Sequence, residues 1–328
     1  MAVVLKTLFD KRKLALTGAR LHAWWEGEAF DEAAAVAAHE AKLAEATAND
    51  KGPEGAEEEL FDEPPFDMPG RLVALGVLWG EGRLRPKSGV AEGLEPARVG
   101  LAADGVLAMI GPGLVGPVAA VAASHPGNID AFEWREESFD ALQYGFARAK
   151  LDKRVTLARI DLEAHVFKAN HYDGLLSADD FAYCGYPPHL AQQIMKCLKP
   201  GACAIVESYV GLPSPALATA FASSFAEPQI RAHGDLLKFF ADAGLQLESD
   251  EDITEECLGA ARAGFKQLGE SIVEAGKLDV NAARELAWEA EAWRARMRLM
   301  TQRRLERRRL ILRKPADTQT GNENAPAG

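Results

Sequence analysis

The sequence has few residues of the kinds that bind metals or form disulfides. It contains only four cysteines in 328 residues, and none has the C-x-x-C spacing of a zinc knuckle or a redox pair. Its seven histidines form no H-x-x-x-H pair, so no metal site is expected. Because so few cysteines are typical of a reducing compartment, we expect a cytoplasmic protein.

Long apolar runs and an excess of positive charge are missing as well. No apolar run reaches the roughly 18 residues of a membrane-spanning helix, and no apolar segment with a small-residue cleavage site indicates a secretory signal. The 37 basic and 49 acidic residues give a net charge of −12, which argues against a nucleic-acid partner. With 48% hydrophobic and 26% charged residues, the composition is that of a globular protein.

Composition and periodicity divide the chain into six segments. Alanine-rich sequence predicts a helical arm, and thirteen acidic residues against two lysines between positions 26 and 64 predict a mobile linker. The segments are the helical arm (1–48), an acidic Pro/Gly linker (49–70), a core (71–250), a helical insertion (251–302), a final strand of the core (303–315) and a disordered tail (316–328).

Short apolar runs alternate with helical patterns through the core. Strands are expected at 105–110, 129–132, 155–160, 174–177, 202–206 and 245–248. Helices are expected at 117–123, 138–150, 189–198 and 234–243, with Lys199-Pro200-Gly201 as a turn. This alternation predicts an α/β protein with a Rossmann-like parallel sheet and helices on both faces.

The charge of the chain reverses near its end. Ten basic residues and only Glu306 lie between Arg294 and Lys314. Leu310-Ile311-Leu312 inside this basic strip is expected to form the last strand, with solvated flanking arginines. The strip could contact nucleic acid, or it could pair with the acidic linker of the same chain.

A glycine-rich loop follows the first predicted strand. Gly111, Gly113 and Gly116 have G-x-G-x-x-G spacing, which lets a backbone approach a ligand closely at the start of a helix. Glu133 lies about 20 residues later, at the end of the next strand, where an acidic residue can bind a ribose. The motif alone is weak, because such glycines can also serve only close packing.

Four ordered blocks resemble the class I S-adenosylmethionine-dependent methyltransferases. They are Met109–Pro117, Phe132-Glu133, Ile160-Asp161-Leu162 and Leu198–Ala202. The resemblance implies a class I methyltransferase sheet with S-adenosylmethionine as cofactor. It further implies that the glycine loop holds the cofactor, that Glu133 binds its ribose, and that Asp161 and Leu162 contact its adenine.

A fifth block lies upstream of the glycine loop. Leu78 to Pro86 is similar to the Gly-Glu-Gly element of phosphoethanolamine and sterol methyltransferases, which implies that Trp79 helps to close the cofactor pocket. The alternative is a helix end with Gly80 and Gly82 as capping residues.

Two positions depart from the family pattern. Met109 stands where the family usually has an Asp that helps to hold the methionine end of the cofactor, and Val115 stands at the usual third loop glycine. Loss of a contact to the cofactor's ammonium group costs a few kcal/mol, or about ten- to a hundredfold in affinity. We expect Val115 to place bulk near the ligand.

Methyl transfer needs alignment of the acceptor and, for an amine or hydroxyl acceptor, a base. The candidates follow the fourth strand, where the family opens its acceptor site: Asp179, Asp180, Tyr183, Tyr186 and His189. Asp179-Asp180 could instead cap the next helix. Glu207 and Tyr209 are expected at the end of the fifth strand, facing the same rim.

The leading hypothesis is an S-adenosylmethionine-dependent methyltransferase that acts on a small-molecule acceptor. Met109 and Val115 motivate an alternative, in which the chain is a catalytically degenerate methyltransferase-like binding or scaffold protein. A nicotinamide dinucleotide enzyme would rest on the glycine loop alone, and Asp161 and the Lys-Pro-Gly turn count against it.

Overall fold

The structure is a computed structural model that describes residues 31–38, 67–80, 82–87, 89–211, 229–274 and 278–316. The chain divides into two compact units, one of residues 1–87 with 256–298 and one of residues 88–255 with 299–328. No helix in the described ranges is both long and apolar enough to cross a membrane.

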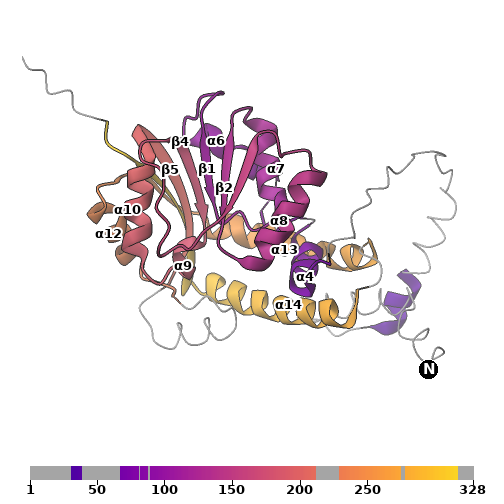
Figure 1. Cartoon of the computed structure of the whole chain (residues 1–328). Helices are drawn as coiled ribbons and strands as arrows, with labels where there is room; N and C mark the ends of the chain where they lie inside the picture. The colour runs from indigo at the N-terminus through magenta and orange to yellow at the C-terminus, as the bar shows by residue number, and fades with distance from the viewer. Residues whose placement is uncertain are drawn as a thin grey trace, which may run out of the picture. The chain divides into compact units, whose positions relative to one another are not determined.

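The second unit is built on one seven-stranded sheet with the order β3-β2-β1-β4-β5-β7-β6 (Figure 1). Strands β1 to β5 pair in parallel, and β7 is antiparallel to both β5 and β6. The strands are β1 (Leu107–Ile110), β2 (Ile129–Glu133), β3 (Val155–Arg159), β4 (Tyr172–Ala178), β5 (Leu198–Gly211), β6 (Gln246–Asp252) and β7 (Leu305–Arg313). The predicted α/β class is confirmed.

Helices cover both faces of this sheet (Figure 1). The helices of the unit are α5 (Gly89–Gly93), α6 (Glu95–Arg98), α7 (Val115–Ser124), α8 (Glu136–Arg148), α9 (Asp180–Tyr183), α10 (Pro187–Cys197) and α12 (His233–Asp242). Side chains alternate between the two faces of a strand. Leu107 and Met109 of β1 therefore join the core under α7 and α8, whereas Ala108 and Ile110 join the core under α10 and α12.

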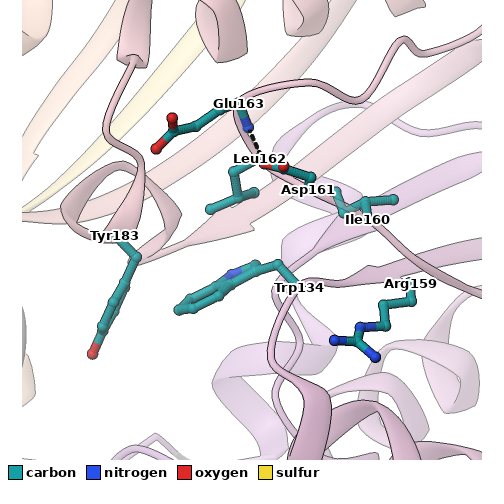
Figure 2. Close-up of a pocket in the computed structure, with 7 residues that line it drawn as sticks. All are labelled: Trp134, Arg159, Ile160, Asp161, Leu162, Glu163 and Tyr183. Atoms are coloured by element: carbon teal, nitrogen blue, oxygen red, sulfur yellow. Dashed lines mark hydrogen bonds between the residues drawn. The ribbon is translucent and has the colours of Figure 1, made fainter.

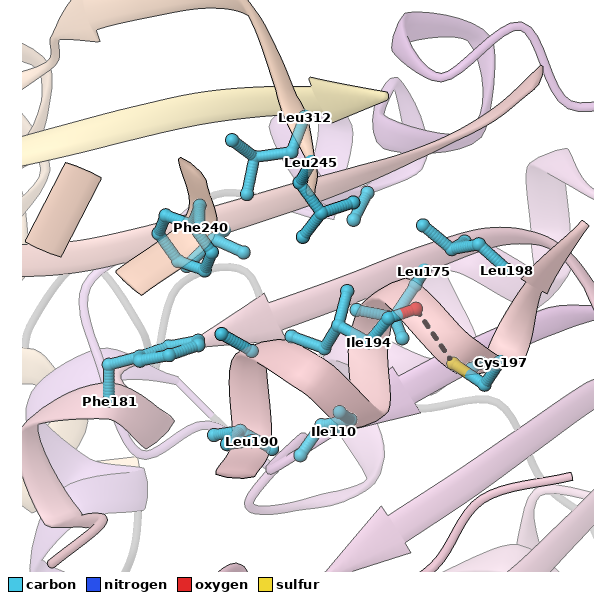
Figure 3. Packing of buried hydrophobic residues seen from close by; sticks show 14 of the residues in the cluster. Ile110, Leu175, Phe181, Leu190, Ile194, Cys197, Leu198, Phe240, Leu245 and Leu312 are labelled. Atoms are coloured by element: carbon cyan, nitrogen blue, oxygen red, sulfur yellow. Dashed lines mark hydrogen bonds between the residues drawn. The ribbon is translucent and has the colours of Figure 1, made fainter. Parts of the chain in front are cut away.

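The core under α10 and α12 is the larger of these two clusters. Ile194 of α10 lies between the sheet residues Ile110 and Leu175, and Phe240 of α12 stacks edge-on against Phe181 (Figure 3). Burying a large apolar side chain contributes about 1.5–3 kcal/mol, so this layer holds the ends of β1 and β4 in place.

The expected Lys-Pro-Gly turn forms a bulge inside β5. Leu198 pairs with Tyr172 and Cys203 pairs with Gly174, so five steps along β5 match only two along β4. Gly201 takes a φ of 81° in this segment, and its N–H donates to Lys314 O. The prediction of a turn was wrong because β7 supplies backbone partners that extend the strand.

The arginines of the last strand correct the expectation that they are solvated. Arg307 and Arg309 are only 4% and 2% exposed. Arg309 pairs with Glu207 at 3.0 Å and with Glu251 at 3.3 Å, so the arginines meet acidic residues of β5 and β6. The acidic linker lies almost wholly outside the described residues.

The first unit contains α4 (Gly70–Trp79) and most of α13 (Thr254–Glu274) and α14 (Val280–Thr301). Trp79 makes edge contacts with Phe265 of α13 and Trp293 of α14, with ring centroids 5.7 and 4.7 Å apart. Arg71 pairs with Glu289 at 2.6 Å. The segment from 71 to 87, assigned to the core by sequence, thus packs with helices of the predicted insertion.

Of the predicted arm, the structure describes only residues 31–38. They form a helix at 32–38, and Asp31 caps it by accepting hydrogen bonds from the N–H groups of Ala33 and Ala34. Most of the linker and all but the first residue of the tail lie outside the described residues.

Candidate functional site at the carboxyl ends of the parallel strands

The glycine loop connects β1 to α7. Gly111 and Gly113 have φ values of 60° and 81°, which glycine adopts without the penalty that a Cβ brings. The Gly111 N–H donates to Phe132 O at 2.8 Å, and the Gly113 N–H donates to Glu133 Oε2 at 2.7 Å. The loop is therefore tied to the end of β2.

The Glu133 carboxylate is fully buried and accepts hydrogen bonds from four donors. Besides the Gly113 N–H, these are the Trp134 N–H at 3.0 Å, the Arg135 N–H at 2.9 Å and Arg135 Nη1 at 2.9 Å. A carboxylate has about four acceptor positions. Three of these donors bind Oε1 and only the Gly113 N–H binds Oε2, so Oε2 keeps an acceptor position in the structure.

A cavity of about 470 Å³ is lined by Trp134, the residue after Glu133 (Figure 2). Its lining comes from the ends of β2 and β3 and from α9: Trp134, Arg159, Ile160, Asp161, Leu162, Glu163 and Tyr183. The rings of Trp134 and Tyr183 are 4.7 Å apart, and the Arg135 guanidinium lies 3.9 Å from the Trp134 ring. An open α/β sheet binds ligands at this edge, and flat aromatic walls suit a flat ring.

Asp161 and Glu163 organise one wall of the cavity. Asp161 Oδ1 accepts from the Glu163 N–H at 2.8 Å, and Glu163 Oε1 accepts from the Gly185 N–H at 2.7 Å. Both carboxylates are exposed enough to keep acceptor capacity. This wall can bind a donor-bearing heterocycle.

The two aspartates after β4 have different surroundings. Asp179 adopts a φ of 71°, and its Oδ1 accepts from Arg307 Nη1 at 2.7 Å. Asp180 is fully buried, and its oxygens accept from Trp134 Nε1 at 2.9 Å and Ser177 Oγ at 2.7 Å. Neither side chain caps α9, so the capping alternative is wrong.

Burial raises the pKa of Asp180 to about 6, since the desolvated carboxylate is costly. The positive charge of Arg135 and the hydrogen bonds from Ser177 and Trp134 oppose this rise, and the negative charge of Glu133 adds to it.

Val115 and Met109 point away from the cavity. The Val115 side chain lies against Gly145 of α8, where an added Cβ would come within 3.0 Å of Val115 Cβ. The expectation that Val115 places bulk near a ligand was wrong, because its side chain fills the space over a helix glycine. Met109 is buried in the core under α7 and α8.

The structure brings together most of the residues selected by sequence. Asp161, Leu162 and Tyr183 line the cavity, and Glu133 and Asp180 are hydrogen-bonded to Trp134 of its lining. Gly111 and Gly113 are hydrogen-bonded to Phe132 and Glu133 at the end of β2. Gly116 lies in the first turn of α7, and His189 Nε2 contacts His165 O at 3.0 Å. Tyr186 is exposed.

Three further placements complete this comparison. Trp79 lies in the first unit, where it is buried and its Nε1 has no hydrogen-bond partner among the described residues. Glu207 and Tyr209 are buried within β5, and the Arg307 guanidinium lies 4.6 Å from the Tyr209 ring. The expectation that they end the strand was wrong, because β5 continues to Gly211.

Sequence reasoning missed Trp134, Arg135 and Arg307. Trp134 and Arg135 directly follow the strand-ending Glu133, and that position was the available signal for both. No local signal marks Arg307, because its partners come from other strands.

Comparisons with known proteins agree with this architecture. No protein-family model matches the sequence, and no curated protein does. A Galdieria sulphuraria structure described as a sarcosine dimethylglycine methyltransferase aligns with a TM-score of 0.62 at 14% identity, covering 75% of this chain and 98% of that one.

Two more structures extend the comparison. A Haemonchus contortus phosphoethanolamine N-methyltransferase with S-adenosylhomocysteine has a TM-score of 0.62 at 19% identity, and the match covers 74% of this chain and 57% of that one. The [4+2]-cyclase SpnF has a TM-score of 0.58 at 16% identity, covering 75% of this chain and 93% of that one. The chain therefore has the Rossmann-like fold of class I methyltransferases.

Proposed function

We propose that the chain is an S-adenosylmethionine-dependent methyltransferase that acts on a small-molecule acceptor. One arrangement supports this above all: the positive-φ glycine loop is joined to the Glu133 carboxylate next to the aromatic-walled cavity. The structural neighbours include proteins that methylate small molecules, which is consistent with this proposal.

The glycine loop and the cavity fit the cofactor, whereas the hydrogen bonds already made to Glu133 limit how its ribose can bind. The glycine loop leaves room for a close ligand, and the cavity between Trp134 and Leu162 can hold an adenine. Three of the four donors on Glu133 are backbone N–H groups, but the fourth is the Arg135 side chain. Oε2, which accepts only from the Gly113 N–H, has a position left for a ribose hydroxyl, whereas a hydroxyl on Oε1 would have to displace this guanidinium.

When bound, S-adenosylmethionine supplies a methyl group on a good leaving group. The chain's own part is to align an acceptor and exclude water. Among the proposed acceptor-side residues Asp179, Asp180, Tyr183 and His189, Tyr183 lines the cavity directly. Arg307 engages Asp179, so that carboxylate is less available as a base.

Calorimetry with S-adenosylhomocysteine and a matched pair of variants tests cofactor binding. Asp161→Ala is expected to weaken binding about tenfold, because a hydrogen bond to a charged acceptor is lost. Asp152→Ala, at an exposed turn before β3, is expected to leave it unchanged. Equal effects of the two substitutions would contradict the placement of the adenine.

A second candidate function is that of a methyltransferase-like protein without methyl transfer. The Arg135 guanidinium on Glu133 Oε1 favours it, and SpnF shows that this fold also occurs in a protein described as a cyclase. The two functions separate in one assay. A methyltransferase produces S-adenosylhomocysteine when given S-adenosylmethionine and a mixture of amine and hydroxyl acceptors, whereas the degenerate protein produces none.

A further inference from the structure

Asp180 lies against the first glycine of the loop. A Cβ built on Gly111 would be only 1.9 Å from Asp180 Oδ1, so the carboxylate takes up the space where any other residue would have a side chain. Ile110 and Ser177 are register partners on the neighbouring strands β1 and β4. The carboxylate therefore reaches the loop from the end of the adjacent strand.

This buried carboxylate has hydrogen bonds but no ion pair within the described residues; the charge of the nearby Arg135 acts on it, but Arg135 pairs with Glu133. Its two contacts are the neutral donors Trp134 Nε1 and Ser177 Oγ, one on each oxygen. Each oxygen keeps a further acceptor position. Within the described residues no Lys, Arg or His forms an ion pair with Asp180, although neighbouring Asp179 is paired with Arg307. A buried charge is costly unless it is paired, so a cationic ligand group beside Asp180 would stabilise its carboxylate.

The loop also lacks the carboxylate that the resemblance leads one to expect from β1. Met109 occupies that position, and its side chain belongs to the core under α7 and α8. Asp180, the first residue of α9 after β4, is the acidic residue that lies against the loop instead. The carboxylate beside the loop therefore comes from the start of α9 and not from β1.

We propose that Asp180 binds the ammonium group of the cofactor's amino-acid portion. It would replace the contact that Met109 cannot make, and Trp134 and Ser177 would act as positioning residues that hold its two oxygens. The proposal rests on the proposed cofactor, and it assigns Asp180 to cofactor binding rather than to proton transfer.

The test compares two ligands that differ only in the ammonium group. Calorimetry is carried out on the full chain with S-adenosylhomocysteine and with its deaminated analogue, in which hydrogen replaces the amino group. The native chain is expected to bind the analogue at least tenfold more weakly. Asp180→Asn is expected to weaken S-adenosylhomocysteine at least tenfold and to leave the analogue within about twofold.

Glu163→Gln is the matched control, because it makes the same carboxylate-to-amide change in the cavity wall. It is expected to shift both ligands by the same small factor. If Asp180→Asn weakens both ligands equally, or weakens neither, the proposal is overturned.

The native chain alone separates failure of this proposal from failure of the proposed function. If it binds neither ligand at millimolar concentration, the proposed function fails. If it binds both with equal affinity, the cofactor site stands and the assignment of Asp180 is wrong. Because this comparison needs no variant, it remains decisive even if Asp180→Asn folds poorly.

Discussion

The charge on Asp180 makes the folded chain less stable at neutral pH. Burial raises its pKa to about 6 from an ordinary value of 3.8, so the folded state holds this proton more tightly than the unfolded state does. The contribution of Asp180 to the free energy of unfolding is therefore fully present below about pH 4. It falls between about pH 4 and 6 and is lost above about pH 6. A pKa difference of about 2 corresponds to about 3 kcal/mol as an upper figure.

Asp180→Asn should consequently stabilise the chain at pH 8. The amide can still accept from Trp134 and can donate to Ser177, so the substitution removes the charge and keeps the hydrogen bonds. Urea unfolding at pH 8 is expected to show a gain of up to about 3 kcal/mol, shrinking toward zero near pH 4. If the variant is less stable than the native chain at pH 8, the charge on Asp180 does not lower the free energy of unfolding.

Gly111 should be the least replaceable glycine of the loop. An alanine there meets both a φ of 60° and the Asp180 carboxylate. Gly100 provides a matched control, since its φ is 65° but nothing lies within 4 Å of an added Cβ. Both substitutions should lower the free energy of unfolding by about 1–2 kcal/mol, because alanine is strained at a positive φ. Urea unfolding should show a further loss for Gly111→Ala alone, and equal losses would count against the contact.

At the scale of elements, arginines of β7 form ion pairs with acidic residues of the two neighbouring strands, β5 and β6. Glu207 and Arg309 are register partners on β5 and β7, and Glu251 and Arg309 are partners on β6 and β7. The strand therefore places a buried guanidinium between acidic residues of both neighbours. Removing the Arg309 guanidinium takes away hydrogen bonds to charged groups, worth about 1.5–3 kcal/mol, while Glu207 keeps its pair with Arg307 at 3.2 Å.

Two substitutions on the same strand test this. Arg309→Met should lower the free energy of unfolding by about 1.5–3 kcal/mol. Arg313→Met removes a partly exposed pair with Glu248 and should cost under about 1 kcal/mol. Chemical denaturation at pH 7 measures both. Similar small losses would mean that the buried ion pairs do not hold the strand.

Most helices and strands were predictable from the sequence. The contacts between residues far apart in the sequence were not. Apolar runs and helical periodicity gave strands β1 to β4 and helices α7, α8 and α10 to within a few residues. The pairing of Arg309 with Glu207 spans about a hundred residues, so no local pattern distinguishes it from a solvated arginine. The bulge at Gly201 was missed for the same reason, because its partner Lys314 is distant in sequence.

At the scale of the whole molecule, the net charge of −12 conceals a segregated distribution. Several arginines of the basic strip are paired with acidic residues on β5, on β6 and directly after β4, among them Glu207, Asp250 and Asp179. The basic strip was suggested by sequence as a contact for nucleic acid. In the structure these arginines form ion pairs within the chain instead.

The sequence predicted those site residues that lie at strand ends. It did not predict contacts that depend on the direction in which a side chain points. Glycine spacing and the acidic end of β2 located Gly111, Gly113 and Glu133. The contact of Asp180 with Gly111, and of Val115 with Gly145, depends on how α9 and α8 pack on the sheet. Periodicity does not specify that packing.

Thermal unfolding of the full chain with S-adenosylhomocysteine tests the central claim most directly. A ligand that binds only the folded state adds RT ln(1 + [L]/Kd), or about 2.7 kcal/mol at a hundredfold excess over Kd. We predict a melting temperature that rises with S-adenosylhomocysteine concentration and does not respond to reduced nicotinamide dinucleotide. An unchanged melting temperature at millimolar S-adenosylhomocysteine would contradict the account.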